Sequence, residues 1–405
     1  MAAGGGGGGG APAPFRVSVP DAELQYLKER LGSTRFPDIL SDIRPWEDGT
    51  DLEYFKEFVE YWRKGYDWRA WEARLNAFDQ FTLEVQGIQM HFVHERSPEP
   101  DAVPLLLLHG WPGSYFEFYK LIPMLQEGGR FHIVAPSLPG YGFSSAPTKR
   151  GCGATAIAGI MDELMGALGY DKYIAQGGDW GGIICRALAK SHAPRCAAVH
   201  VNMCVATPSF TSPWHIVQIA NIALAPSLPL ALTADEMKGV QDMRAFQKRE
   251  TAYQKIQGTK PQTLAYALQD SPAGLAAWIL EKFQTWSDCH GNPESALSKD
   301  EMLTNIGIYW FGGRIASSMR LYKETIANRT EMGAMLSGYS PTPVGVAVFP
   351  KELFRPPRSW VGKIYNLQQW SVMDRGGHFA ALEQPRLLAD DILKFVRLAK
   401  DKAWV

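Results

Sequence analysis

The stretch Gln176-Gly177-Gly178-Asp179-Trp180-Gly181-Gly182 places an aspartate in a glycine-rich turn, where many hydrolases carry a serine. A short apolar run, residues 173–175, precedes the turn, and a helical pattern over 183–190 follows it. Strand, sharp turn and helix in this order are typical of a nucleophile elbow. A carboxylate there can attack carbon directly and form an ester, whereas a serine must first be deprotonated. The alternative is a surface turn whose aspartate only caps a helix.

The sequence around this turn alternates between strand-like and helix-like segments. Strands are expected at 103–109, 131–136, 173–178 and 197–203, and again at 344–349 and 369–373. Such alternation indicates a mostly parallel central sheet flanked by helices. The helix-like, aromatic stretch from 207 to about 340 is too long to be a structureless connection, so it should form a cap. We therefore predict an α/β-hydrolase fold with an inserted helical cap.

These patterns divide the 405-residue chain into consecutive parts. The expected parts are a disordered glycine-rich leader (1–14), an N-terminal extension of helices and a strand meander (15–95), the first part of the core (96–205), the cap (206–340) and the second part of the core (341–405). The leader contains an unbroken glycine run from Gly4 to Gly10 and lacks the layout of a signal peptide.

Composition excludes several classes of partner. The net charge of −1 gives no reason to expect nucleic acid. No apolar run reaches the length of a membrane span, so no membrane anchor is expected. The five cysteines are odd in number and form no C-x-x-C pair. This pattern favours reduced thiols in a cytoplasmic protein over a disulfide framework or a zinc site.

The turn after the first expected core strand reads Leu108-His109-Gly110-Trp111-Pro112-Gly113-Ser114. In an α/β-hydrolase this loop supplies one backbone N–H of the oxyanion hole, and the residue after the nucleophile supplies the other. These donors would be Trp111 and Trp180, because Pro112 has no N–H to donate. A glycine–proline turn without a catalytic role is the alternative.

The general base is expected in Gly376-Gly377-His378-Phe379, after the last strand. A histidine near its ordinary pKa of ~6.5 can activate the water that hydrolyses an ester. His109 is the rival, with bracing of the oxyanion loop as its more fitting role. The acid that orients His378 should be Glu352, just beyond the 344–349 strand, with Asp374 as the competitor.

A carboxylate opens an epoxide only if the ring oxygen is hydrogen-bonded or protonated as charge develops on it. Tyrosine hydroxyls in a dry cap can provide this. The cap offers several tyrosines, among which spacing does not choose: Tyr253, Tyr266, Tyr309, Tyr322 and Tyr339.

Together these motifs resemble the microsomal-type epoxide hydrolases, including their soluble fungal relatives. The matching segments are His109 to Ser114, Pro136-Ser137-Leu138-Pro139-Gly140-Tyr141-Gly142-Phe143-Ser144, Gly177 to Gly181, Asp270-Ser271-Pro272-Ala273-Gly274-Leu275-Ala276-Ala277-Trp278-Ile279, Gly376 to Glu383, Tyr66 to Arg69 and Leu75-Asn76. The resemblance runs from about residue 15 to the C-terminus. It departs from the membrane-bound members at the glycine-rich leader, where they carry a hydrophobic anchor.

The resemblance implies roles for individual residues. Asp179 would be the nucleophile and His378 the base, with Glu352 as the orienting acid. It also selects Tyr253 and Tyr322 as the cap tyrosines that hold the epoxide oxygen. Members of the soluble branch often form homodimers, and no cofactor or metal is implied.

The working hypothesis is an enzyme that converts an epoxide and water to a vicinal diol through an ester on Asp179. A haloalkane dehalogenase is the closest alternative, because it uses the same fold and an Asp-Trp elbow. A non-catalytic ligand receptor on this fold is a second alternative, and an esterase would need a serine at the elbow. The sequence does not identify the substrate.

Overall fold

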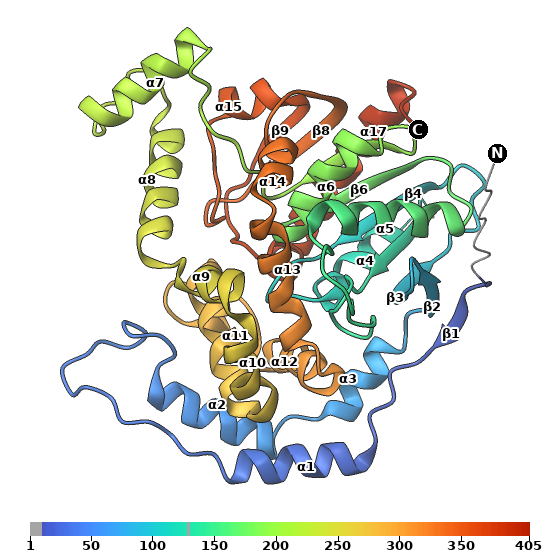
Figure 1. Cartoon of the computed structure of the whole chain (residues 1–405), viewed down its shortest axis with the longest axis vertical. Helices are drawn as coiled ribbons and strands as arrows, with labels where there is room; N and C mark the ends of the chain where they lie inside the picture. Colours follow the sequence, from blue (N-terminus) through green and yellow to red (C-terminus); the bar gives the residue numbers. More distant parts are fainter. Residues whose placement is uncertain (1–9, 128–129) are drawn as a thin grey trace.

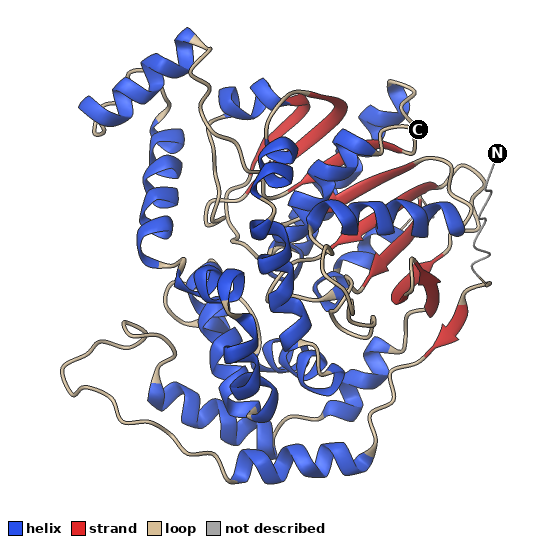
Figure 2. Cartoon of the chain, viewed as in Figure 1, coloured by secondary structure: helices blue, strands red, loops and turns tan. Residues whose placement is uncertain are grey.

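The computed structural model describes residues 10–127 and 130–405, and its centre is one nine-stranded sheet (Figures 1 and 2). The strand order is β1-β2-β3-β5-β4-β6-β7-β8-β9. The strands are β1 (Ala13–Phe15), β2 (Gln80–Val85), β3 (Ile88–Glu95), β4 (Val103–Leu108), β5 (Phe131–Pro136), β6 (Tyr173–Gly177), β7 (Cys196–Val201), β8 (Ser340–Val348) and β9 (Tyr365–Val372).

The sheet is parallel from β5 to β9 and antiparallel at its other edge, where β3, β2 and β1 follow one another. Helices α5 and α6 pack together over one face, and α4 and α17 cover the other. The bounds of the helices around the sheet are α4 (Leu121–Gln126), α5 (Ala154–Ala167), α6 (Asp179–Ser191), α15 (Arg358–Ile364), α16 (Ala380–Glu383) and α17 (Pro385–Asp401), with a 3-10 turn η1 (Tyr115–Phe118). The predicted α/β-hydrolase architecture is confirmed.

A group of helices lies between β7 and β8, beside the carboxyl ends of the parallel strands (Figure 1). They are α7 (Pro213–Leu224), α8 (Ala234–Arg249), α9 (Ala252–Thr259), α10 (Pro261–Asp270), α11 (Pro272–Trp286), α12 (Lys299–Gly312), α13 (Ile315–Ala327) and α14 (Arg329–Leu336), with a 3-10 turn η2 (Pro293–Ser295). This segment is the one for which the sequence predicts a cap. Within the described ranges, no helix is long and apolar enough to cross a bilayer.

The N-terminal segment contributes to the sheet and also supports the cap. Its helices are α1 (Asp21–Gly32), α2 (Leu52–Lys64) and α3 (Trp68–Leu75), and Figure 1 shows α1 and α2 running along the bottom of the cap helices. Arg30 pairs with Asp270 at 2.8 Å, and the Tyr61 hydroxyl and the Trp71 indole both donate to Asp300. These contacts fix α10 and α12 on the N-terminal helices.

Three strand boundaries differ from the sequence prediction, and one of them is the start of β9, at Tyr365 instead of 369. Residues 1–9 lie outside the described part of the chain, but Ala13 and Pro14 belong to β1, so the assignment of a disordered leader to 1–14 is wrong for these two. They pair with Thr82 and Phe81 of β2, a partner that local composition does not reveal. Strand β8 begins at Ser340 instead of 344, because a register shift accommodates the proline-rich start of the strand.

A buried arginine joins α6 to the chain as it returns from the cap to the sheet. Arg186 is 1% exposed, and its guanidinium donates to the carbonyls of Met335 (3.2 Å), Gly338 (2.5 Å) and Ile364 (2.8 Å). It also lies 4.4 Å from the ring centroid of Tyr365. The helix that begins at Asp179 is therefore tied directly to the segments that lead into β8 and β9.

We expect Arg186→Leu to lower the free energy of unfolding by about 2–4 kcal/mol, because buried carbonyls would lose their donors. Arg386→Leu is the matched control, since Arg386 forms an exposed pair with Glu127 and its replacement should cost about 0.5 kcal/mol or less. Urea denaturation measures both. Equal effects of the two substitutions would contradict a structural role for the Arg186 contacts.

Candidate active site

Asp179 occupies the sharp turn between β6 and α6, and it is the first residue of the helix. Its φ of +48° lies in the left-handed region, a strained conformation for a residue with a side chain. The side chain is 17% exposed. A Cβ atom on Gly110 would lie 2.1 Å from Asp179 Oδ1, so only glycine there lets the oxyanion loop approach the carboxylate.

His378 connects Asp179 to a second carboxylate. Its Nε2 lies 3.3 Å from Asp179 Oδ2, and its Nδ1 lies 2.7 Å from Glu352 Oε1. The Glu352 side chain is 1% exposed, and the same oxygen accepts the backbone N–H of Leu353. Asp374, the competing acid, is 71% exposed and pairs with Arg375. Glu352, and not Asp374, is therefore the second carboxylate that contacts His378.

The two carboxylates determine the protonation of His378. Burial alone would lower the pKa of its imidazole, but the charges and hydrogen bonds of Glu352 and Asp179 raise that pKa well above its ordinary value. Burial raises the pKa of the Glu352 carboxyl, whereas the charge and hydrogen bond of His378 lower it. With both carboxylates charged, the imidazole is held as an imidazolium.

One of the two predicted oxyanion donors contacts the same carboxylate. The backbone N–H of Trp111 donates to Asp179 Oδ1 at 2.8 Å. The N–H of Trp180 belongs to the first turn of α6, where backbone donors lack acceptors within the helix. His109 braces this loop: its Nδ1 lies 3.0 Å from the carbonyl of Gly110, and its Nε2 accepts the N–H of Leu138. Burial lowers the pKa of His109 to about 4, so it is neutral.

Tyr253 of α9 and Tyr322 of α13 meet above the oxyanion loop. Tyr253 stacks on Trp111 at 5.3 Å between ring centroids, and Tyr322 packs edge-on against Trp111 at 5.9 Å. Their own rings are 5.8 Å apart. Burial and the nearby Asp179 charge raise the pKa of both hydroxyls, so both keep their protons. Tyr266 and Tyr339, also candidates by sequence, are exposed, and Tyr309 is buried and donates to the carbonyl of Gly113.

Sequence reasoning missed the groups that hold the loop of His378. The carboxylate of Glu383 accepts the backbone N–H groups of Gly377 (2.9 Å), Phe379 (2.9 Å) and Asp288 (2.8 Å). The carbonyl of Trp286, at the end of α11, accepts the N–H of His378 at 3.0 Å. Glu383 lies in a segment singled out by resemblance, but nothing local indicates its role.

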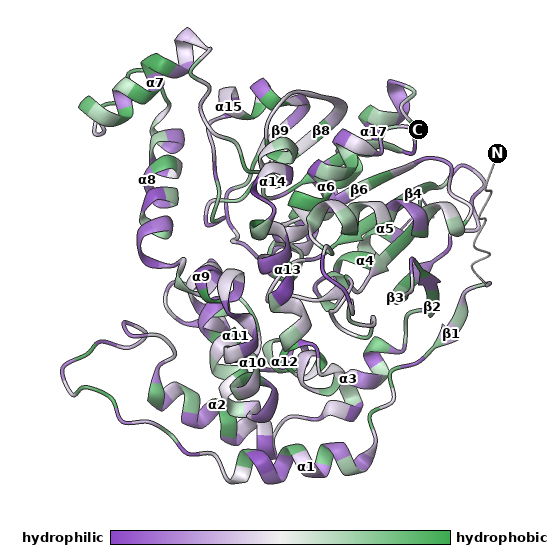
Figure 3. Cartoon of the chain, in the orientation of Figure 1, coloured by the Kyte–Doolittle hydropathy of each residue, from purple (hydrophilic) through white to green (hydrophobic). Residues whose placement is uncertain are grey.

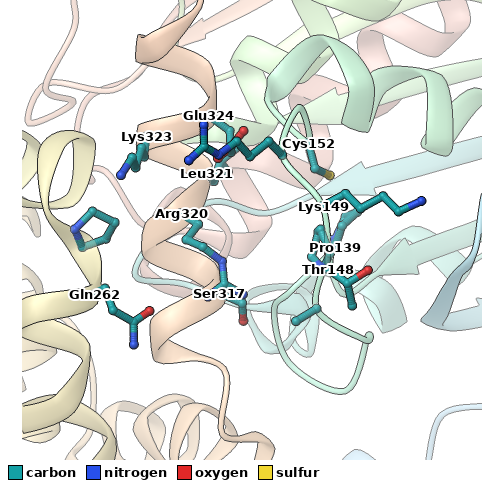
Figure 4. Close-up of a pocket in the computed structure, with 14 residues that line it drawn as sticks. Pro139, Thr148, Lys149, Cys152, Gln262, Ser317, Arg320, Leu321, Lys323 and Glu324 are labelled. Atoms are coloured by element: carbon teal, nitrogen blue, oxygen red, sulfur yellow. The ribbon is translucent and has the colours of Figure 1, made fainter.

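A pocket of about 570 Å³ lies between α13 and the 139–152 loop (Figure 4). Ser317, Arg320 and Lys323 line it from the helix, and Pro139 and Lys149 from the loop. None of the predicted catalytic residues lines this pocket. In the described ranges, no group of three or more His, Cys, Asp or Glu side chains is placed to hold a metal ion.

Two family models and several curated relatives match this chain. A family model described as the epoxide hydrolase N terminus matches residues 12–118, and one for the alpha/beta hydrolase fold matches residues 103–296. A Stigmatella aurantiaca protein that bears an epoxide hydrolase name is 43% identical over 96% of this chain and 86% of its own length. Epoxide hydrolase 1 of Sus scrofa is 37% identical over 96% of this chain and 89% of its own.

Solved structures give the same result. The Aspergillus niger epoxide hydrolase superposes with a TM-score of 0.85 at 36% identity, covering 96% of each chain. The juvenile hormone epoxide hydrolase of the silkworm Bombyx mori superposes with a TM-score of 0.88 at 32% identity, covering 97% of this chain and 96% of that one. An aspartate elbow, a buried histidine–carboxylate pair and nearly full-length relatives lead to one conclusion: the chain belongs to the epoxide hydrolases.

Proposed function

We propose that this epoxide hydrolase forms its vicinal diol in two steps, with Asp179 as the nucleophile and His378 as the base. The observation that carries the proposal is the placement of the Asp179 carboxylate. One of its oxygens accepts the N–H of Trp111 at 2.8 Å, and the other lies 3.3 Å from His378 Nε2. The carboxylate is thus oriented by the Trp111 N–H and by His378, which are the groups needed to hydrolyse the ester.

In the first step an Asp179 oxygen attacks an epoxide carbon, and the ring C–O bond breaks. The released oxygen takes a hydrogen bond from Tyr253 or Tyr322 and then a proton from one of them. The side-chain N–H of Gln254 donates to the Tyr253 oxygen at 3.0 Å, which leaves the hydroxyl proton of Tyr253 free for substrate. The product is a hydroxyalkyl ester, and the tyrosine regains its proton from solvent.

Ester formation prepares the second step electrostatically. The ester carries no negative charge on Asp179. Because that charge is one of the two that raise the pKa of His378, the pKa of the imidazole falls. The imidazolium then gives its proton to solvent, and the neutral His378 takes a proton from water as the water oxygen attacks the ester carbonyl. The Trp111 and Trp180 N–H groups stabilise the oxyanion, and Glu352 stabilises the imidazolium. The acyl C–O bond then breaks, the leaving oxygen takes the proton of the new Asp179 carboxyl, and the diol departs from the restored carboxylate.

We expect Asp179→Asn to lower diol formation from styrene oxide and a terminal alkyl epoxide by about 10³-fold or more, because the ester is no longer formed. Asp374→Asn, at the exposed carboxylate, is the matched control and should keep full activity. Chromatographic assay of the diol measures both. Full activity of Asp179→Asn would contradict the scheme, and chloride release from a chloroalkane without epoxide turnover would favour a dehalogenase.

We expect Tyr253→Phe and Tyr322→Phe each to slow ester formation by about 10–10²-fold, because one donor to the developing oxyanion is lost. Ester hydrolysis should keep its rate, since neither hydroxyl acts in that step. Rapid-mixing single-turnover kinetics separate the two rates. Tyr266→Phe, at an exposed tyrosine of the same cap, is the control. Unchanged ester formation in both site variants would remove the tyrosines from the mechanism.

The cysteines support a reducing compartment, and we propose the cytoplasm as the location. All five thiols are free, and four of them are buried. Burial raises the pKa of the partly buried Cys152 to about 11, so its thiol stays protonated and poorly reactive.

We also propose that the enzyme forms a homodimer through α7. The buried face of this helix carries Gln218, which hydrogen-bonds Ser359 and Trp360. Its other face leaves Trp214, Val217 and Leu224 exposed. The sequence between Arg195 and Asp235 contains no lysine, arginine, aspartate or glutamate. Figure 3 shows α7 as a largely hydrophobic helix that projects from the upper left of the molecule. An uncharged apolar face of this kind favours burial against another protein surface.

We expect Trp214→Glu together with Leu224→Glu to weaken the dimer by about 10²-fold, because two charges would be buried in an apolar interface. Light scattering coupled to gel filtration measures the mass at several concentrations. Tyr266→Glu, on an exposed aromatic of α10, is the control and should leave the dimer intact. A monomeric parent enzyme, or a dimer that survives the α7 substitutions, would overturn this assignment.

A further inference from the structure

A small space is lined in part by Asp179, and neither of the two reaction steps uses it. Its volume is about 10 Å³, close to the minimum that holds one water molecule. Among the residues that line it are Asp179, His378, Glu117, Gln176 and Asn202. Two of these belong to the reaction, and the other three are polar groups beside it.

Glu117 enters this space from η1, directly after the oxyanion loop. Its carboxyl has no hydrogen-bond partner in the described part of the chain, although it is close enough to His378 and Asp179 to interact with their charges. A Cβ atom on Gly113 would lie 1.3 Å from Glu117 Oε1, so the carboxyl fills the place of a side chain at 113. Burial, partly offset by His378, raises the pKa of Glu117 to about 8.

Gln176, which also lines this space, supplies a second unused polar group. Gln176 is 1% exposed, and its Nε2 donates to Asn202 Oδ1 at 2.9 Å. Its Oε1 is buried and has no partner among the described residues. Buried polar atoms are rarely left unpaired, and a buried water typically makes two to four hydrogen bonds. In the resting enzyme the imidazolium N–H of His378 can donate to a water molecule, while the Glu117 carboxyl and Gln176 Oε1 can accept its two O–H groups.

We propose that this cavity holds the water that hydrolyses the Asp179 ester, and that Glu117 is the residue that positions it. The inference rests on the two-step function proposed above. One O–H of the water gives its proton to His378 Nε2 as the oxygen bonds to the ester carbonyl carbon. The other O–H donates to an oxygen of Glu117, which has an accepting oxygen in either protonation state. Glu117 therefore acts through the water and does not touch the epoxide.

The test separates the two chemical steps by single-turnover fluorescence, which follows tryptophans such as Trp111 and Trp180 beside the ester. In Glu117→Leu we expect ester formation at the parent rate and ester hydrolysis slowed by about 10–10²-fold, because the water loses an orienting partner. The ester should accumulate, so kcat and KM fall together while kcat/KM is kept. Glu117→Gln, which retains an accepting oxygen, should lose less.

Further variants make the outcome decisive. Gly113→Ala retains the Glu117 side chain but displaces its carboxyl, because the added methyl group takes that space, and it should also slow hydrolysis selectively. Glu72→Gln is the matched control, because Glu72 is a buried carboxylate that accepts the N–H of Val19 in the N-terminal segment. Equal losses in both steps, or no loss in either Glu117 variant, would overturn the proposal. Failure of the proposed function is distinguishable, because the parent enzyme would then form no ester at all.

Discussion

The active site depends on one imidazole placed between two carboxylates. His378 lies 2.7 Å from Glu352 and 3.3 Å from Asp179, and each acid comes from the end of a different strand. The parallel sheet makes this possible, because the carboxyl ends of its strands meet at one edge. Arg186 ties the nucleophile's helix to β9, and Glu383 holds the loop of His378 through three backbone N–H groups. One charge in this set disappears when the ester forms, and that loss converts a protonated histidine into a base.

Trp111 connects the oxyanion loop to the cap. Its backbone N–H binds Asp179, while its ring contacts the rings of Tyr253, Tyr322 and Trp286. These contacts bring residues from α9, α11 and α13 onto one indole, so the position of the cap and that of the oxyanion donor depend on each other. Lys282, which is buried, lies 4.7 Å from the Tyr253 ring centroid and adds a cation–π contact to this cluster.

The sequence predicted the elbow and most of the sheet because both have local signals. Glycines around Asp179 and short apolar runs identify β4 to β7 within one or two residues of their bounds. The strand at Ala13 and the early start of β8 escaped prediction, because proline and glycine obscure strands that only pairing stabilises. The roles of Glu117 and Glu383 also have no local signal in the sequence. Glu383 accepts a backbone N–H from Asp288, which is far away along the chain, and Glu117 occupies space that Gly113 leaves open. The cap tyrosines came from family resemblance alone, since spacing could not choose among the candidates.

A single turnover in water enriched in oxygen-18 tests whether Asp179 bonds covalently to the substrate. Enzyme in excess over epoxide is quenched, and mass spectrometry locates the label. If Asp179 forms the ester, the diol carries an unlabelled oxygen from Asp179 and the peptide that contains Asp179 carries one oxygen-18. Label in the diol of the first turnover, with an unlabelled Asp179 peptide, would mean that water attacks the epoxide directly and that no ester forms.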